Sequence, residues 1–297
     1  MKESQWYERF MKIIFMLAAL TSVMAVALIC VFLFYNGLSA IGQVGFMKFI
    51  TGRIWKPNMD MYGIFPMIVG SIYVTAGAIL VGVPIGILTS VFMAMYCPEK
   101  IYRPLKAASE LLAGIPSVVY GFFGLVVLVP WTRQFSHLLN GMGLISYSGN
   151  GSGIFVASIL LGTMILPTII GVTESAIRSV NKSYYEGALA LGATHERAIF
   201  KIIIPAAKSG LIAGIVLGIG RAIGETMAVI MVAGNQARMP IGIFKGVRTL
   251  TANIVIEMGY ATDLHRGALI GTGLVLFVFI LIINASVSLL NRRSSNE

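Results

Sequence analysis

The chain has 297 residues, of which 57% are hydrophobic and 11% are charged, and its mean hydropathy is +0.86. An ordinary soluble domain carries about 25% charged residues, so this composition excludes a water-soluble globular protein and indicates a membrane protein. The formal net charge of +10 is explained by basic residues that flank membrane segments, because the sequence has no basic and aromatic patch typical of nucleic-acid binding.

Uncharged stretches long enough for membrane helices divide the chain. A helical crossing of the bilayer needs about 20 residues. Five stretches of this kind carry no charge, and a sixth contains only one arginine and one glutamate. The predicted spans are 13–35, 64–96, 111–132, 154–173, 209–235 and 267–291. The sequence therefore predicts an all-α, polytopic membrane protein with six transmembrane helices, which together form one transmembrane domain over 13–291.

Basic residues indicate the orientation of these spans. An even number of spans puts both termini on the same side of the membrane. The segments on that side contain thirteen Lys and Arg residues, and those on the opposite side contain eight. Because positive charge is enriched on the cytoplasmic side, the amino-terminal segment 1–12 and the tail 292–297 are predicted to be cytoplasmic.

The predicted cytoplasmic loop 178–208 is unusually long for a connector and has helix-boundary residues of its own. Ser183 and Glu186 have the spacing of a capping box at a helix start, and Gly192 suits the left-handed conformation that follows a helix. Thr194 is a candidate cap for a second short helix. The apolar face of this second helix, which we expect to lie on the membrane, consists of Ala198, Ile199, Ile202 and Ile203.

Periodicity alone leaves two interpretations of this loop. It is either an amphipathic hairpin that lies on the bilayer or a docking element for a soluble partner. A two-turn helix fixed at both ends can move as a rigid lever, which is the property that coupling to a partner requires.

Two charged residues lie inside the fifth predicted span. Arg221 falls near the middle of 209–235, where a charge costs about 2.5 to 3.5 kcal/mol, so it is expected to face the bundle interior. Glu225 follows four residues later and would share its face on a continuous helix. The pair is either an internal ion pair that locks helix packing or part of an anion path, since a guanidinium matches the oxygens of an oxyanion.

Small residues surround this pair. Gly210, Gly214 and Gly218 repeat every four positions, which favours close approach of a neighbouring helix. Gly220 and Gly224 flank the arginine, and we expect them also to leave room for a solute.

The sequence predicts no metal site and no resident cofactor. Cys30 and Cys97 lack the spacing of a metal or disulfide motif, and His137, His195 and His265 fall in three separate loops. No Gly-x-x-x-x-Gly-Lys-Ser/Thr phosphate loop is present, so any ATP hydrolysis must take place in a partner chain.

The loop 178–208 resembles the EAA loop of ABC importer permeases. The resemblance rests on Glu186-Gly187-Ala188, on Gly192, and on Ile202-x-Ile204-Pro205. The family pattern has Ala where this chain has Gly187, and Leu where it has Ile204. The resemblance implies that a short helix in this loop inserts into a cytoplasmic ATPase subunit. The residues implied in this coupling are Ser183, Glu186, Gly187, Ala188 and Gly192, with Glu186 and Gly187 in contact with the partner.

The chain is also similar to PstC-type permeases of the ABC phosphate importer. Gly-Arg-Ala-Ile-Gly-Glu-Thr-Met-Ala-Val at 220–229 carries the resemblance, together with segments around 55–66 and 110–121. It implies a type I ABC importer permease-like bundle in a prokaryotic cell membrane, without catalytic residues, that moves inorganic phosphate inward by alternating access. The implied partners are a PstA-like second permease subunit, two PstB-like ATP-binding subunits and a PstS-like phosphate-binding protein outside the membrane.

Two other functions remain open at this point. One is an ABC permease for another oxyanion, such as molybdate or sulfate, because Arg221 alone does not distinguish tetrahedral anions. The other is a secondary anion transporter in which Arg221 and Glu225 form the coupling pair.

Overall fold

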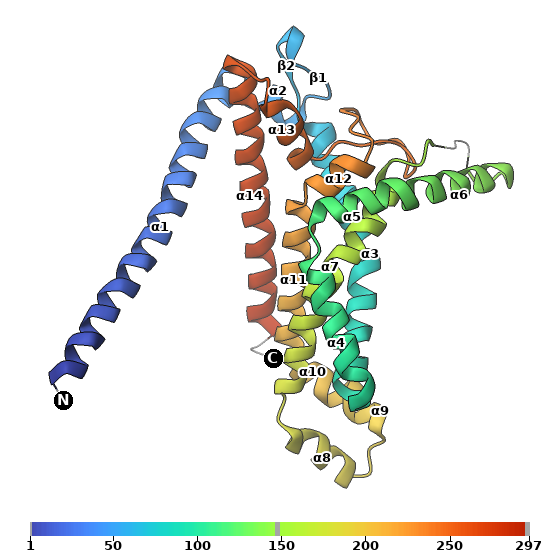
Figure 1. Ribbon diagram of the computed structural model, residues 1–297. Coiled ribbons are helices and arrows are strands. Elements are labelled where there is room, and N and C mark those ends of the chain that lie inside the picture. Colours follow the sequence, from blue (N-terminus) through green and yellow to red (C-terminus); the bar gives the residue numbers. More distant parts are fainter. Residues whose placement is uncertain (1, 146–148, 295–297) are drawn as a thin grey trace.

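The structure is a computed structural model that describes residues 2–145 and 149–294, and nearly all of its elements are helices (Figure 1). A two-stranded hairpin and several short 3-10 and π-helices (η1 to η4) complete it. In chain order the elements are α1 (Lys2–Val44), α2 (Phe46–Thr51), β1 (Trp55–Lys56), η1 (Pro57–Met59), β2 (Met61–Tyr62), α3 (Phe65–Val91), η2 (Phe92–Tyr96), α4 (Glu99–Gly114), α5 (Ser117–Phe123), η3 (Gly124–Leu128), α6 (Val129–Gly141), α7 (Ile154–Ser179), α8 (Lys182–Ala190), α9 (His195–Ala198), η4 (Ile199–Ile203), α10 (Ile204–Ala206), α11 (Lys208–Gly224), α12 (Met227–Val232), α13 (Leu250–Met258) and α14 (Asp263–Ser294).

Five helical segments of the described chain are long and apolar enough to cross a membrane. A sixth crossing results when α11 is joined to the short helices that precede it, from which it is bent by 68°. The five segments are Tyr7–Val44, Phe65–Tyr96, Ser117–Gly141, Ile154–Ser179 and Asp263–Ser286. The predicted all-α membrane fold is thus confirmed.

Close packing of α3, α7 and α11 forms the centre of the molecule. A Cβ added at Gly82 of α3 would lie 2.7 Å from Ile165 of α7, and one added at Gly218 of α11 would lie 2.9 Å from Ile169 of α7. Only glycine permits this approach, so the predicted packing role of Gly218 is confirmed. The side chains that fill the core between these helices are almost fully buried, as at Leu160 of α7.

The first helix lies apart from this bundle. Figure 1 shows α1 leaning away from the other helices along most of its length and meeting α14 near its carboxyl end. Phe34 and Phe277 make an edge-to-face contact there, with ring centroids 6.3 Å apart. Most apolar side chains of α1 are therefore exposed in the isolated chain, as expected for a helix that faces lipid or a partner.

The third span has different bounds from those predicted. The predicted segment 111–132 crosses the end of α4 and the start of α5, because Pro116 has an extended backbone and caps α5. The apolar helical segment runs instead over Ser117–Gly141, and Figure 1 shows its last part, α6, extending sideways from the bundle. A proline cannot donate the backbone hydrogen bond that a continuous helix would need here, so the chain turns.

The two ends of the bundle carry different elements. At one end lie the hairpin of β1 and β2, in which Trp55 pairs with Tyr62, and the short helix α13 (Figure 1). At the other end lie α8 and α9, together with the amino end of α1 and the carboxyl end of α14. The predicted tail 292–297 falls partly outside the described residues.

Candidate functional site

A helix break divides the fifth predicted span. Helix α11 ends at Gly224, Glu225 has an extended backbone (φ −67°, ψ 132°), and α12 begins at Met227. The prediction of one continuous helix over 209–235 is therefore wrong. Irregular backbone at membrane depth is tolerated where it is covered by protein or lines a water-filled cavity. We therefore expect the break to face protein or a cavity rather than lipid.

Arg221 lies in the last turn of α11 and is half-buried. Its Nη1 atom donates a long hydrogen bond of 3.5 Å to Thr168 Oγ1 of α7. The side chain thus contacts the neighbouring helix α7 rather than lipid, as expected for a charge within the membrane. The carboxyl end of a helix also carries a partial negative charge, which favours a cation in the last turn.

Glu225 does not pair with Arg221. Its carboxylate accepts hydrogen bonds from the backbone N–H groups of Thr226, at 3.0 Å, and Ala228, at 3.3 Å, and among the described residues no ion pair within 4.0 Å joins it to the arginine. The predicted pair on one helical face is wrong because the extended backbone at Glu225 turns its side chain toward the start of α12. There it satisfies N–H groups that have no partner within the helix.

The break leaves open space beside the arginine. A Cβ added at Gly220 or Gly224 would meet no atom within 4 Å, whereas one at Gly214 would lie 2.8 Å from Thr173 Oγ1. The first two glycines therefore do not serve helix packing within this chain. Their role in the solute path stays a prediction.

The helix α8 in the predicted coupling loop is capped by a different residue from the one expected. The Asn181 side chain accepts a hydrogen bond from the backbone N–H of Ser183 at 3.0 Å, and the helix begins at Lys182. The predicted capping box with Ser183 at the N-cap is wrong by two residues, because an asparagine is an equally good cap. Gly192 has a φ of +80°, which confirms the predicted left-handed position after the helix.

The predicted contact residues are presented outward on this helix. Glu186 and Gly187 are exposed, whereas Ala188 is buried against the chain. Leu191, just beyond the helix, is 91% exposed. In Figure 1, α8 protrudes beyond the end of the bundle, so a partner can reach its exposed face.

The second short helix of the loop packs on protein rather than on lipid. The Thr194 side chain accepts from the Arg197 N–H at 3.3 Å, which confirms the predicted cap. Ala198, Ile199 and Ile203 are almost fully buried, and the two isoleucines belong to a cluster with residues from α3, α7 and α11. The prediction that this apolar face lies on the membrane is therefore wrong.

Aromatic contacts fix the two halves of the loop to the bundle. Tyr185 of α8 is hydrogen-bonded to His195 Nδ1 of α9 at 2.5 Å. The His195 ring also lies edge-on to Tyr96, at the end of η2, with centroids 4.9 Å apart. This histidine therefore has a structural role that the sequence pattern did not indicate.

A buried carboxylate connects this end of the bundle to α4. Glu174 of α7 accepts hydrogen bonds from Lys106 Nζ and Tyr102 Oη of α4, both at 2.7 Å, and from Arg178 Nε at 2.8 Å. Its side chain is only 1% exposed. The hydrogen bond to Glu174 raises the pKa of Lys106 above its ordinary value, so the ion pair is fully formed at neutral pH. Sequence reasoning missed this cluster because its members are about 70 residues apart.

The described residues contain no group of three or more His, Cys, Asp and Glu side chains that could hold a metal ion. The charged groups at the helix break and at Glu174 instead contact backbone amides, hydroxyls or one another.

Comparison with known proteins relates this geometry to transport. The family model described as binding-protein-dependent transport system inner membrane component matches residues 82–296. The chain is 40% identical over 275 residues to the probable ABC transporter permease protein YqgH of Bacillus subtilis, which covers 89% of this chain and 86% of that protein. It is 35% identical over 267 residues to the phosphate transport system permease protein PstC of Mesorhizobium japonicum, covering 86% of this chain and 81% of that protein.

Solved structures share the fold at low sequence identity. A chain of the inward-facing MetNI methionine ABC transporter is 18% identical, with a TM-score of 0.57, and the match covers 81% of this chain and 99% of that one. A chain of a bacterial ABC transporter involved in the import of alginate is 19% identical, with a TM-score of 0.56, and the match covers 92% of this chain and 95% of that one. The bundle is thus that of type I ABC importer permeases.

Proposed function

The chain belongs to the family of binding-protein-dependent transport system inner membrane components, and we propose that it is the permease subunit through which an ATP-driven importer moves inorganic phosphate into the cytoplasm. As an ABC permease it is a transport component and not an enzyme. Phosphate as the solute is supported by the 35% sequence identity over 267 residues with a phosphate transport permease. A half-buried arginine beside open space at a helix break supports an anionic solute.

The solute path runs past the helix break. Arg221 supplies a planar guanidinium that replaces part of the hydration of a crossing oxyanion, and Gly220 and Gly224 leave room for the solute to approach. Glu225 shapes the path by capping α12 rather than by neutralising the arginine. Within the described residues the arginine therefore has no carboxylate partner that competes with the anion, and its one long bond there, to Thr168, is easily exchanged.

Coupling to ATP hydrolysis takes place through α8. The exposed positions Glu186 and Gly187 contact an ATP-binding subunit, Ala188 packs the helix against the chain and Gly192 ends it, and Ser183 lies in the first turn next to the Asn181 cap. The helix is joined to α9 and η2 through Tyr185 and His195. A movement of α8 therefore reaches α3 and α7, whose ends pack on the same apolar cluster.

The assembly and orientation follow from this role. The chain pairs with a PstA-like permease subunit, with two PstB-like ATP-binding subunits on the side of α8 and with a PstS-like binding protein on the opposite side. The segment 1–12, the loop 178–208 and the tail 292–297 face the cytoplasm, and the domain 13–291 spans the cell membrane of a prokaryote.

Uptake of radiolabelled phosphate into proteoliposomes that contain the complete complex tests this function. We expect uptake that requires ATP on the side of α8 and loaded binding protein on the opposite side. If molybdate or sulfate stimulates ATP hydrolysis by the complex as strongly as phosphate does, an importer of another oxyanion is favoured. Uptake driven by an ion gradient without ATP would contradict the assignment to an ATP-driven importer.

A further inference from the structure

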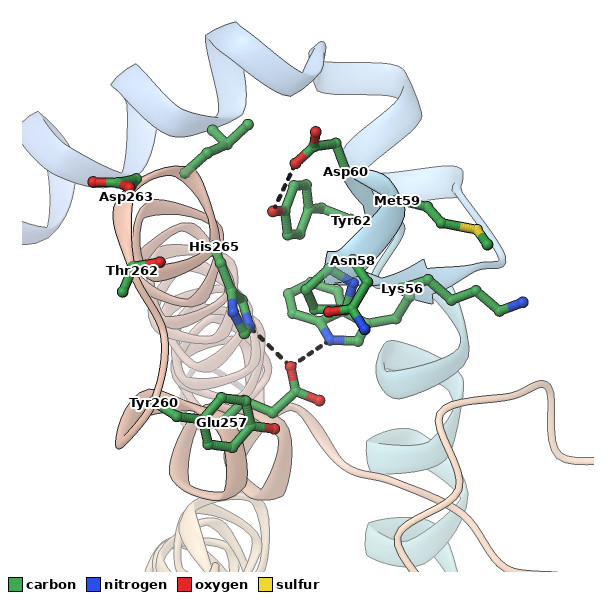
Figure 2. A pocket seen from close by; sticks show the side chains of 13 residues that line it. Lys56, Asn58, Met59, Asp60, Tyr62, Glu257, Tyr260, Thr262, Asp263 and His265 are labelled. Carbon is green, nitrogen blue, oxygen red and sulfur yellow. Dashed lines mark hydrogen bonds and ion pairs between the residues drawn. The ribbon is translucent and has the colours of Figure 1, made fainter.

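A pocket of about 900 Å³ opens at the end of the molecule opposite α8. Figure 2 shows that one wall comes from the hairpin of β1 and β2 and the other from the turn between α13 and α14. The side chains of Trp55 and Tyr62 line the first wall, and those of Tyr260 and His265 line the second. None of these residues belongs to the helix break or to α8, so the pocket is separate from the site described above.

The acidic residues of this end of the molecule are gathered in the pocket. In the segments that lie there, the acidic residues are Asp60, Glu257 and Asp263, and all three line the pocket. The same segments carry eight basic residues. Asp60 and Asp263 are exposed and, within the described part of the chain, form no ion pair within 4.0 Å. The pocket is therefore an acidic spot on a largely basic surface.

Aromatic rings form the sides of the same pocket. The rings of Tyr62 and His265 are nearly parallel, with centroids 6.1 Å apart, and the Tyr260 ring lies 6.0 Å from that of His265. Burial raises the pKa of the Tyr62 and Tyr260 phenols, so both stay neutral near pH 7. The Tyr62 ring is stacked on His265 and only 4% exposed, whereas Tyr260 is 65% exposed, so the Tyr260 ring is the neutral aromatic face that a cation beside the carboxylates can reach.

The floor of the pocket is rigid. The buried carboxylate of Glu257 accepts a hydrogen bond from Trp55 Nε1 at 2.7 Å and is paired with His265 Nε2 at 2.9 Å (Figure 2). It also accepts a hydrogen bond from Arg248 Nη1 at 2.5 Å. These contacts join the hairpin, α13 and α14 at one point. Because Glu257 is neutralised within the chain, the unpaired negative charge of the pocket lies at its rim, on Asp60 and Asp263.

We propose that this pocket receives a basic side chain, Arg or Lys, from a loop of the extracytoplasmic solute-binding protein. The proposal rests on the proposed function, which places that protein at this end of the chain. The two carboxylates at the rim outnumber the single Lys56 ammonium there, which disfavours an anion such as phosphate as the occupant. The volume is far larger than a single ion needs and accommodates a long side chain with its flanking backbone.

Helix α13 connects the pocket to the helix break. Helix α13 begins near the helix break, where Thr251 Oγ1 donates to the carbonyl oxygen of Glu225 at 3.1 Å, and ends at the floor of the pocket, where Glu257 lies. One rigid helix of nine residues thus leads from the docking pocket to the solute path. Occupation of the pocket therefore acts directly on the break.

The test measures binding of purified, phosphate-loaded binding protein to the complete complex in nanodiscs. The double substitution Asp60→Asn and Asp263→Asn removes both charges and keeps the fold, since both residues have positive φ values of 52° and 41°, which asparagine tolerates well. We expect Kd to rise about tenfold or more, and the effect to shrink at high salt.

Two single variants serve as controls. Lys56→Gln removes a positive charge from the same rim, so binding should be unchanged or tighter, and Arg238→Gln, which is exposed outside the pocket, should leave Kd unchanged. A double variant that binds within twofold of the wild type, or weaker binding by Lys56→Gln, would overturn the inference. If the wild-type complex imports phosphate and the double variant still binds normally, the docking pocket fails and the proposed function stands.

Discussion

The hydroxyl of Thr251 lies 3.1 Å from the carbonyl oxygen of Glu225 and donates a hydrogen bond to it. This bond joins α13 to the break between α11 and α12, two elements that are separated by about 26 residues in the chain. The carbonyl belongs to a residue with extended backbone, so it has no partner within a helix. Thr251 therefore stabilises the irregular backbone beside Arg221.

Replacement of Thr251 by Val should weaken the communication between the binding protein and the helix break. Valine has the same shape but cannot donate, so about 1 kcal/mol of stabilisation is lost at the break. We expect the stimulation of ATPase activity by loaded binding protein to fall severalfold while basal activity is unchanged. Thr272→Val is the matched control, because Thr272 is also buried and bonds only within its own helix. Equal effects of both variants would contradict a specific role.

Arg221→Gln should reduce phosphate uptake by about 10- to 100-fold, because a hydrogen bond to a charged group contributes about 1.5 to 3 kcal/mol. Arg221→Lys should fall between this variant and the wild type, since it keeps the charge but loses the planar fork. Both complexes should assemble, because Arg221 makes only one long hydrogen bond within the part of the chain that the structure describes. Size-exclusion chromatography checks assembly and uptake checks transport. Failure of Arg221→Gln to assemble would show a structural role instead.

Gly187→Trp should uncouple ATP hydrolysis from uptake. An added Cβ at Gly187 meets no atom within 4 Å of it, so a side chain can leave the helix there without a clash at its first carbon. A loss of coupling would therefore report a clash with the partner. The ratio of phosphate transported to ATP hydrolysed is the measurement, and Gly141→Trp, at an equally open position in α6, is the control. Unchanged coupling would mean that the contact lies elsewhere on α8.

Asn181→Ala should loosen α8, whereas Ser183→Ala should have little effect. The Asn181 side chain caps the helix, and removal of such a cap costs about 0.5 to 2 kcal/mol. Hydrogen exchange of the α8 amides measures the difference directly. Faster exchange in Ser183→Ala than in Asn181→Ala would restore the capping box that the sequence predicted.

Glu174→Ala should destabilise the protein strongly. It leaves Lys106, Tyr102 and Arg178 without their common acceptor. Loss of one partner of a fully buried ion pair costs about 3 to 5 kcal/mol, and this is the upper bound here because Lys106 and Arg178 are 30% and 45% exposed and water can solvate them. Thermal unfolding in detergent checks this. Arg103→Gln breaks the exposed pair with Glu99 on α4, and it should change the unfolding temperature little. A similarly small effect of Glu174→Ala would show that α4 is held by other contacts.

Several features of this protein are determined by short stretches of its sequence. Membrane spans follow from the length of uncharged segments, and the conformation after α8 follows from Gly192, because only a residue without a side chain adopts a φ of +80° at low cost. The Thr194 cap is equally local. Each of these features depends on residues within a few positions of one another, so a pattern in the sequence is enough to predict it.

Tertiary structure alone decided the features that depend on distant residues. The extended backbone at Glu225 is stabilised by Thr251, and the carboxylate of Glu174 by Lys106, across gaps that no helical or strand period relates. Asp60 and Asp263 lie about 200 residues apart and share one pocket. Packing brings such groups close enough to interact. Electrostatic and hydrogen-bond energies depend on separation in space rather than on separation along the chain, so a sequence pattern does not predict these contacts.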